Sequence, residues 1–195
     1  MRGSLVMAAA LSLVSLSSRW ARADGFEAQL ATGVSFGFQN RNEYGTGSFS
    51  RIYPEILVYG YLGGFAGPVW FRPGLRLAYA SEQAEMPQSL RVEERDFSGA
   101  AEVGVLYDWY VIPSFALGGG IISRKIELVT EGAASSAGDS VGASETLPFI
   151  HAQLGVGIPL WQGFVVVEPY YRYASVQKDA RITSSYGLEL TFRVL

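Results

Sequence analysis

The chain has 195 residues, a length that suits a single domain with a substantial core. Its 15 basic and 18 acidic residues give a net charge of −3, which argues against nucleic acid as a partner. It has 49% hydrophobic residues, 23 glycines and no cysteine. If exported, it therefore has no disulfide framework and depends on packing, hydrogen bonding or a membrane.

The first 23 residues have the organisation of a secretory signal peptide. Arg2 supplies a short positive region, and the apolar run at residues 5–16 is too short to cross a bilayer as a helix. Ala21, Arg22 and Ala23 then form the small-x-small pattern that signal peptidase accepts. We expect cleavage after Ala23, which leaves a mature domain of residues 24–195. Loss of three arginines leaves 12 basic against 18 acidic residues, a net charge of about −6.

The mature part consists of segments in which apolar residues alternate with polar or small ones. In residues 26–38 every second side chain is apolar, with Thr32 as the exception. Glu27 and Gln29 lie on the opposite face. Strict alternation indicates a β-strand, long enough for the ~9–11 residues of a tilted membrane strand. The same pattern predicts seven more strands, at residues 49–61, 69–80, 97–108, 114–128, 146–160, 164–175 and 181–194. Within 114–128 the apolar phase shifts between Ile121 and Ile122, which predicts a β-bulge.

The connections between the predicted strands alternate in length. Segments 62–68, 109–113 and 161–163 are short, whereas 39–50, 81–95 and 130–144 are long, polar and rich in glycine or serine. Eight strands with short turns at one end and long loops at the other are typical of an outer-membrane barrel. With both termini at the short-turn end, the long loops would face outside.

Aromatic residues gather at the predicted short turns. Tryptophan and tyrosine favour membrane interfaces, because their rings are apolar and their polar edges bind water. The alternative is that they are core aromatics of a soluble sandwich. We predict an interface girdle made of Trp70, Trp109, Trp161, Tyr61, Tyr107 and Tyr110.

Together, the signal peptide, the eight amphipathic strands and the terminal segment YGLELTFRVL resemble small outer-membrane barrels of the OmpA/OmpX type. The resemblance covers the whole mature chain and implies an all-β, eight-stranded antiparallel up-and-down transmembrane β-barrel in the Gram-negative cell envelope. It implies outer-membrane lipid, and the barrel assembly machinery during insertion, as partners, with the protein a porin-like monomer. In such barrels the terminal strand usually ends on an aromatic residue. Here the aromatic is Phe192, and the chain continues to Leu195.

In such a barrel the polar face points into a lumen just wide enough for side chains to fill. Charges crowded there must pair, and arginine suits this because its planar group binds a carboxylate at two points. Neighbouring strands suggest that Arg172 pairs with Glu189. We predict a lumen charge network that plugs the barrel, made of Glu27, Glu55, Arg72, Arg76, Glu102, Glu168, Arg172, Glu189 and Arg193.

Depth along the strands predicts two further sets of partners in this network. Arg76 should lie between Glu55 on the second strand and Glu102 on the fourth. Barrel closure makes the first and last strands neighbours, so Glu27 should approach Arg193 near the short turns.

The sequence offers no constellation for catalysis or metal binding. His151 is the only histidine, and with no cysteine it cannot build an ordinary zinc site. By strand parity it points inward beside Gln153, and no serine stands two residues away, so the Ser–His pair of the lipid A deacylase barrels is not expected. We expect no cofactor, no metal and no catalytic residue.

We therefore predict a structural or surface-interaction role exerted through the long outer loops, whose ligand the sequence does not identify. The alternative is a small channel or transporter for ions or small apolar molecules. A lipid-modifying barrel enzyme is the third possibility, and a soluble exported barrel is the rival at the level of fold.

Overall fold

The computed structural model describes residues 27–42, 48–86, 90–130, 140–176 and 181–193, and all structural statements concern these ranges. The expected signal peptide, its cleavage site and Leu195 lie outside them. Within them, no helix combines the length and the apolar character needed to cross a membrane.

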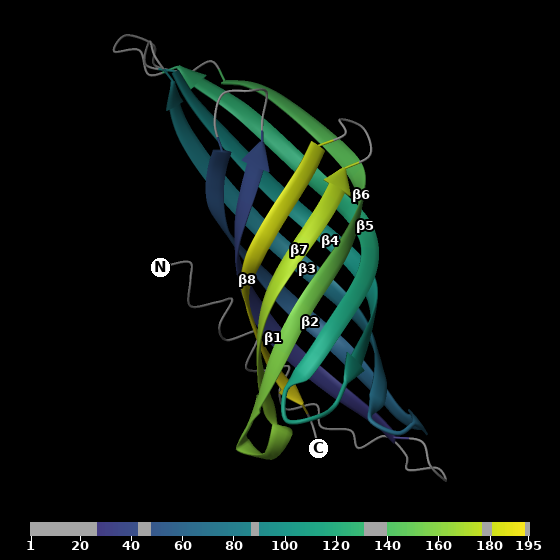
Figure 1. The fold of residues 1–195 in the computed structure, drawn as a ribbon. Helices are drawn as coiled ribbons and strands as arrows, with labels where there is room; N and C mark the ends of the chain where they lie inside the picture. Colours follow the sequence, from purple (N-terminus) through teal and green to yellow (C-terminus); the bar gives the residue numbers. More distant parts are fainter. Residues whose placement is uncertain (1–26, 43–47, 87–89, 131–139, 177–180, 194–195) are drawn as a thin grey trace.

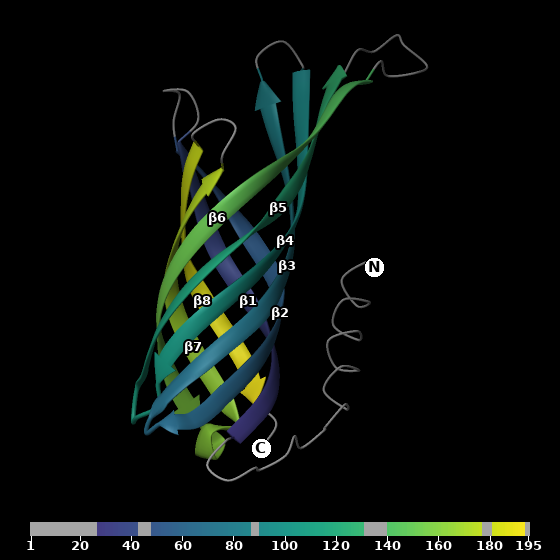
Figure 2. The same cartoon turned by 90° about the vertical axis from the view of Figure 1, so that its right-hand side faces the viewer.

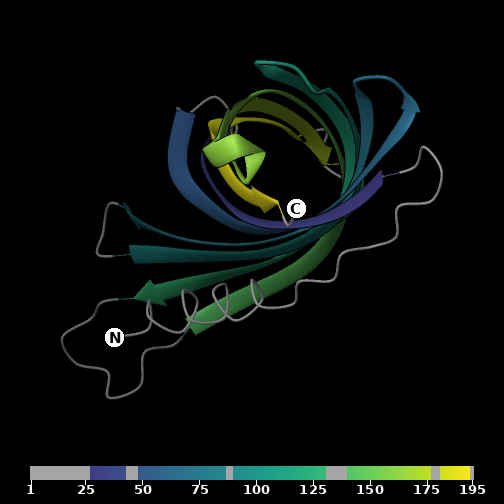
Figure 3. The same ribbon diagram turned by 90° about the horizontal axis from the view of Figure 1, so that it is seen from below.

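Eight antiparallel strands close into a barrel in the order of the chain, with β1 paired to both β2 and β8 (Figures 1 and 3). The strands are β1 (Glu27–Asn42), β2 (Ser48–Ala66), β3 (Val69–Met86), β4 (Leu90–Tyr107), β5 (Ile112–Thr130), β6 (Ser140–Leu160), β7 (Val165–Val176) and β8 (Arg181–Arg193). A short 3₁₀ turn, η1 (Trp161–Gly163), joins β6 to β7. The predicted eight-stranded up-and-down barrel is confirmed.

The alternation of the sequence becomes an alternation between the inside and the outside of the barrel. Leu75 and Leu77 are 59% and 51% exposed, whereas Arg76 between them is only 3% exposed. Successive side chains on a strand point to opposite faces, so the apolar side chains cover the outer wall and the polar ones fill the lumen. This is the reverse of a soluble protein and the arrangement expected for a barrel surrounded by lipid.

The outer wall carries an apolar band with aromatic residues at both edges. On β4, the exposed Phe97 and Tyr107 bound a stretch that includes the exposed Val103 and Val105. Ten residues of a strand tilted by about 40° rise roughly 25 Å, the height of the apolar band of outer-membrane barrels. The wall therefore matches the hydrophobic thickness of that membrane.

β5 is regular, so the predicted β-bulge is wrong. Its register with β4 and with β6 stays constant along the paired residues. The apolar phase shifts because Ile122 points into the lumen, where it packs in a small apolar cluster with Leu147 and Val176. The register does shift between β2 and β3, between Leu62 and Ala66.

The two ends of the barrel differ. The short-turn end contains the start of β1, the end of β8 and the connections β2–β3, β4–β5 and β6–β7. The connections β1–β2, β3–β4, β5–β6 and β7–β8 define the long-loop end. Toward the long-loop end the wall divides, because the described β2–β3 pairing stops at Glu55–Ala78 and the β6–β7 pairing stops at Phe149–Val176.

Beyond these points β3, β4, β5 and β6 remain paired with one another, and they rise above the barrel (Figure 2). We call this part the protruding sheet: residues 79–86 of β3, 90–97 of β4, 123–130 of β5 and 140–148 of β6. The sequence predicted much of it as loop.

Candidate functional site: the charged lumen

The lumen is filled by charged and polar side chains that the strand alternation turns inward. Those that are buried include eleven ionisable residues, namely Glu55, Arg72, Arg76, Asp96, Glu102, Arg124, His151, Glu168, Arg172, Glu189 and Arg193. Asp96 and Arg124 were not predicted. Asp96 lies just before the predicted start of its strand, and Arg124 follows the phase shift that made the orientation of β5 ambiguous.

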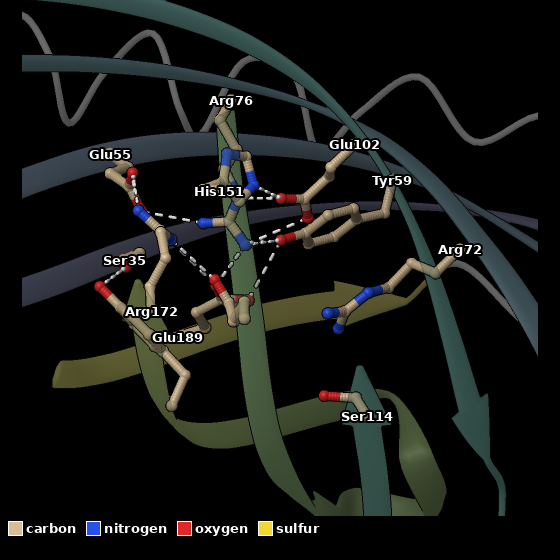
Figure 4. Close-up of polar contacts among 12 residues, drawn as sticks. Ser35, Glu55, Tyr59, Arg72, Arg76, Glu102, Ser114, His151, Arg172 and Glu189 are labelled. Carbon is tan, nitrogen blue, oxygen red and sulfur yellow. Dashed lines mark hydrogen bonds and ion pairs between the residues drawn. The ribbon is translucent and has the colours of Figure 1, made fainter. Parts of the chain in front are cut away.

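Arg76 is the centre of the network (Figure 4). Its Nε donates to Glu102 at 2.5 Å, its Nη1 to Glu55 at 2.8 Å, and its Nη2 to Glu189 at 2.5 Å. Nη2 also donates to the hydroxyl of Tyr59 at 2.6 Å. Arg76 therefore lies between Glu55 and Glu102 as predicted. It also reaches across the lumen to β8, a contact that neighbouring strands did not suggest.

Arg172 completes this central cluster from β7. It binds Glu55 at two points, with Nη1 and Nη2 lying 2.6 and 2.8 Å from the two carboxylate oxygens. Its predicted partner, Glu189, is 3.8 Å away. The β7–β8 register places Arg172 opposite Ser185 and Glu189 opposite Glu168, so Arg172 reaches Glu55 more directly.

A second ion pair lies nearer the short-turn end. Arg72 donates to the two oxygens of Glu168 at 2.8 and 3.4 Å, and Ser114 donates to the same carboxylate at 2.5 Å. The guanidinium of Arg72 also lies 4.6 Å from the centroid of the Tyr59 ring. Gly155 makes room for this pair, because a Cβ at that position would lie 2.1 Å from Glu168 Oε1.

A third cluster, around Arg124, lies near the long-loop end. Its Nε is 3.1 Å from Glu94 and 3.2 Å from Asp96, and its Nη1 is 3.8 Å from Glu145. Arginine–carboxylate contacts therefore occur at three depths of the lumen. Such pairs offset the cost of burying the charges. The contacts of Arg72, Arg76 and Arg172 also join strands that are not neighbours, whereas Arg124 contacts only the strands beside its own.

His151 belongs to the central cluster. Its Nε2 lies 3.0 Å from Glu102 and its ring stacks on Phe149. The side chain is buried in the lumen beside the buried Gln153, as strand parity predicted. Among the residues that the structure describes, no group of three or more metal-ligating side chains could hold a metal ion.

The predicted pair of Glu27 and Arg193 does not form. The β1–β8 register places Arg193 opposite Ala31, four residues along β1 from Glu27, which is about 13 Å. The guanidinium of Arg193 instead lies 4.5 Å from the ring centroid of Tyr61.

Comparison with known proteins rests on structure. No protein-family model matches this sequence, and no curated protein matches it. Ail of Yersinia pestis matches with a TM-score of 0.53 at 16% identity, over 88% of this chain and 99% of Ail. Neisserial surface protein A gives 0.52 at 14% over 88% and 99%, and a major outer membrane protein of Thermus thermophilus gives 0.53 at 9% over 83% and 99%.

The chain has the fold of the small eight-stranded outer-membrane barrels. At this level of identity the likeness concerns the fold alone.

Four of the predicted interface aromatics are exposed at the short-turn end. Tyr107, Trp109, Tyr110 and Trp161 are all exposed, in positions where they could form a girdle. Phe164, also exposed, packs edge-to-face with Phe192.

Tyr61 and Trp70 do not lie on the outer surface. Tyr61 is 1% exposed, and Trp70 packs against the apolar cluster that contains Tyr61 inside the barrel. Both residues lie close to a short turn, which suggested that they belong to the girdle. The alternation along the strand, however, determines whether a side chain points outward or into the lumen. Tyr61 shares a face with Tyr59, and Trp70 shares one with Arg72.

A small cavity of about 50 Å³ lies in the lumen on the long-loop side of the central cluster. Tyr53, Ser98, Ile122, Phe149 and His151 are among the residues that line it. It offers room for one or two water molecules. The charged side chains fill the lumen below it.

Proposed function

We propose that this chain is an integral outer-membrane protein that presents the protruding sheet as an interaction surface outside the cell. The observation that carries the proposal is the division of the wall, which leaves β3 and β6 without partners along residues 79–86 and 140–148 within the described chain. The apolar band supports membrane insertion. Outer-membrane lipid and the assembly machinery are the other partners in the proposal, and the protein acts as a monomer.

The lumen supports an interaction role rather than transport. Arg76 extends from β3 to Glu189 on β8, and Arg172 on β7 binds Glu55 on β2. These contacts join opposite walls at the middle of the barrel, where a channel would need open space. No catalytic role is proposed, because His151 contacts Glu102 and is directed into the lumen.

Strand edges that have no partner among the described residues favour a partner that is itself extended. An edge strand presents unpaired N–H and C=O groups, and a peptide can add to it as a further strand through main-chain hydrogen bonds. The charged residues whose side chains are described on the outward face of the protruding sheet instead pair with each other. Arg95 lies 3.1 Å from Glu93, and Lys125 lies 2.5 Å from Glu127. The hydrogen bond from Lys125 lowers the pKa of the Glu127 carboxyl.

Membrane location is tested by extracting outer membranes and comparing gel migration of heated and unheated samples. A folded barrel that migrates differently after heating, and whose long-loop end is cleaved by protease added to intact cells, supports the proposal. Recovery in the soluble fraction would contradict it.

The interaction surface is tested with a library of displayed ten-residue peptides, selected on the folded barrel in detergent. Bound peptides should slow hydrogen exchange in residues 79–86 or 140–148. Proline cannot donate a main-chain hydrogen bond, so Ala143→Pro and Ser144→Pro form a matched pair. These neighbours direct their N–H groups to opposite edges of β6, and only the variant that alters the free edge should lose peptide. Selected peptides that bind both variants equally would refute the β6 edge as the site.

A further inference from the structure

Arg193 differs from the other buried arginines of the lumen. Each of the other four has a carboxylate within ion-pair distance: Arg72, Arg76, Arg124 and Arg172. Arg193 is only 7% exposed, yet in the described part of the chain it makes no ion pair, and its Nε is buried without a hydrogen-bond partner. The ring of Tyr61 beneath its guanidinium offsets only part of the lost hydration. A buried cation in this state favours the arrival of an anion.

Arg193 is also accessible from one side. It lines a cavity of about 650 Å³ that opens at the short-turn end. This volume falls within the range of sites for small ligands. Arg193 thus combines a buried charge with access to this cavity. The arginines of the central cluster are buried but do not line it.

The other walls of this cavity define the chemistry of a ligand. Gln29 and Gln162 contribute side-chain amides, Trp109 contributes an aromatic surface, and Asp108 contributes a carboxylate. Asp108 makes no ion pair within the described residues, so it repels ligands with several negative charges. It favours a ligand that carries one anionic group together with N–H donors.

We propose that this mouth binds the free C-terminal carboxylate of a short peptide that enters from the short-turn side. A carboxylate fits the planar donor pair of Arg193. The peptide groups behind it suit the amides of Gln29 and Gln162, and a peptide N–H or ammonium group suits Asp108. The site lies at the opposite end of the barrel from the protruding sheet and is independent of the function proposed for that sheet.

The test uses the full chain folded in detergent, with NMR signals of the tryptophan indole groups as the readout. Three probes are compared: N-acetyl-alanyl-alanine with a free carboxylate, the same dipeptide as its C-terminal amide, and acetate. The acid should shift the Trp109 signal saturably, and the amide should bind roughly ten times more weakly, because it lacks the charge-assisted contact. Acetate should also bind more weakly than the dipeptide acid.

Two variants of Arg193 separate charge from geometry. Arg193→Gln should abolish the preference for acid over amide, and Arg193→Lys should keep part of it, because lysine retains the charge but not the fork. Gln162→Ala, the matched control, should weaken both dipeptides to the same extent. Gel migration before and after heating shows whether each variant is folded. If Arg193→Gln does not fold, the proposal is tested by the preference for acid over amide in the wild type and in Arg193→Lys.

Three results would overturn the proposal. They are equal binding of acid and amide to the wild type, an unchanged preference in folded Arg193→Gln, and acetate binding as tightly as the dipeptide acid.

Discussion

Replacement of Arg76 tests whether the charge network holds the barrel closed. Arg76→Ala removes the guanidinium that binds Glu55, Glu102 and Glu189. Glu55 keeps its two contacts with Arg172, so the loss of stability is smaller than the sum for three broken ion pairs. Breaking one buried pair costs about 3–5 kcal/mol, and we expect the free energy of unfolding to fall by about that amount.

The assay is equilibrium unfolding by denaturant in detergent, followed by tryptophan fluorescence. Arg95→Ala is the matched control, because its ion pair with Glu93 is exposed and worth about 0–1 kcal/mol. The double variant Arg76→Met, Glu102→Gln removes a cation together with an anion, and it should recover much of the loss.

Conductance in planar bilayers gives a second measurement on the same variant. Removal of Arg76 takes away the side chain that connects Glu55, Glu102 and Glu189 across the lumen, so small-ion conductance should rise above that of the wild type. A loss of less than about 1 kcal/mol together with unchanged conductance would refute the plug.

Substitutions at three further positions test local features. Gly155→Ala should lower the free energy of unfolding by about 1–3 kcal/mol, because its Cβ would meet Glu168 Oε1 at 2.1 Å; an unchanged denaturation midpoint would contradict this packing. Gln162→Gly should raise the free energy of unfolding by about 0.5–1 kcal/mol, because Gln162 has a φ of 60° and glycine adopts this left-handed conformation without strain. A loss of stability would show that the backbone there is unstrained. His151→Ala should cost about 1–3 kcal/mol by removing a partner of Glu102, and His151→Gln should cost less if it restores that hydrogen bond.

Much of the architecture could be predicted because alternation is a property of each strand alone. The sequence Leu75, Arg76, Leu77 predicts an apolar outer wall and a polar lumen, and the structure has this arrangement. The alternation fades where a strand leaves the apolar band. For this reason much of the protruding sheet was predicted as loop, although pairing of β3 and β4 continues to Met86 and Leu90.

Partners inside the lumen could be predicted only where they lie on adjacent strands at similar depth. Arg76 with Glu55 and Glu102 is such a case. Its contact with Glu189 joins residues separated by 113 positions, and Arg193 misses Glu27 by four residues of register. Both the contact of Arg76 with Glu189 and the register of Arg193 relative to Glu27 are determined by closure of the barrel.

The sequence by itself therefore determined the eight strands, the need for charges to pair and, outside β5 and the protruding sheet, the face that a side chain takes. It did so because side-chain direction follows from a period of two along one strand. Only the tertiary structure decided which charges meet, that Arg193 has no carboxylate partner within the described chain, and how far β3 to β6 rise above the wall. These depend on register, since a slip of two residues keeps every side chain on its face but moves it by about 7 Å along the barrel wall.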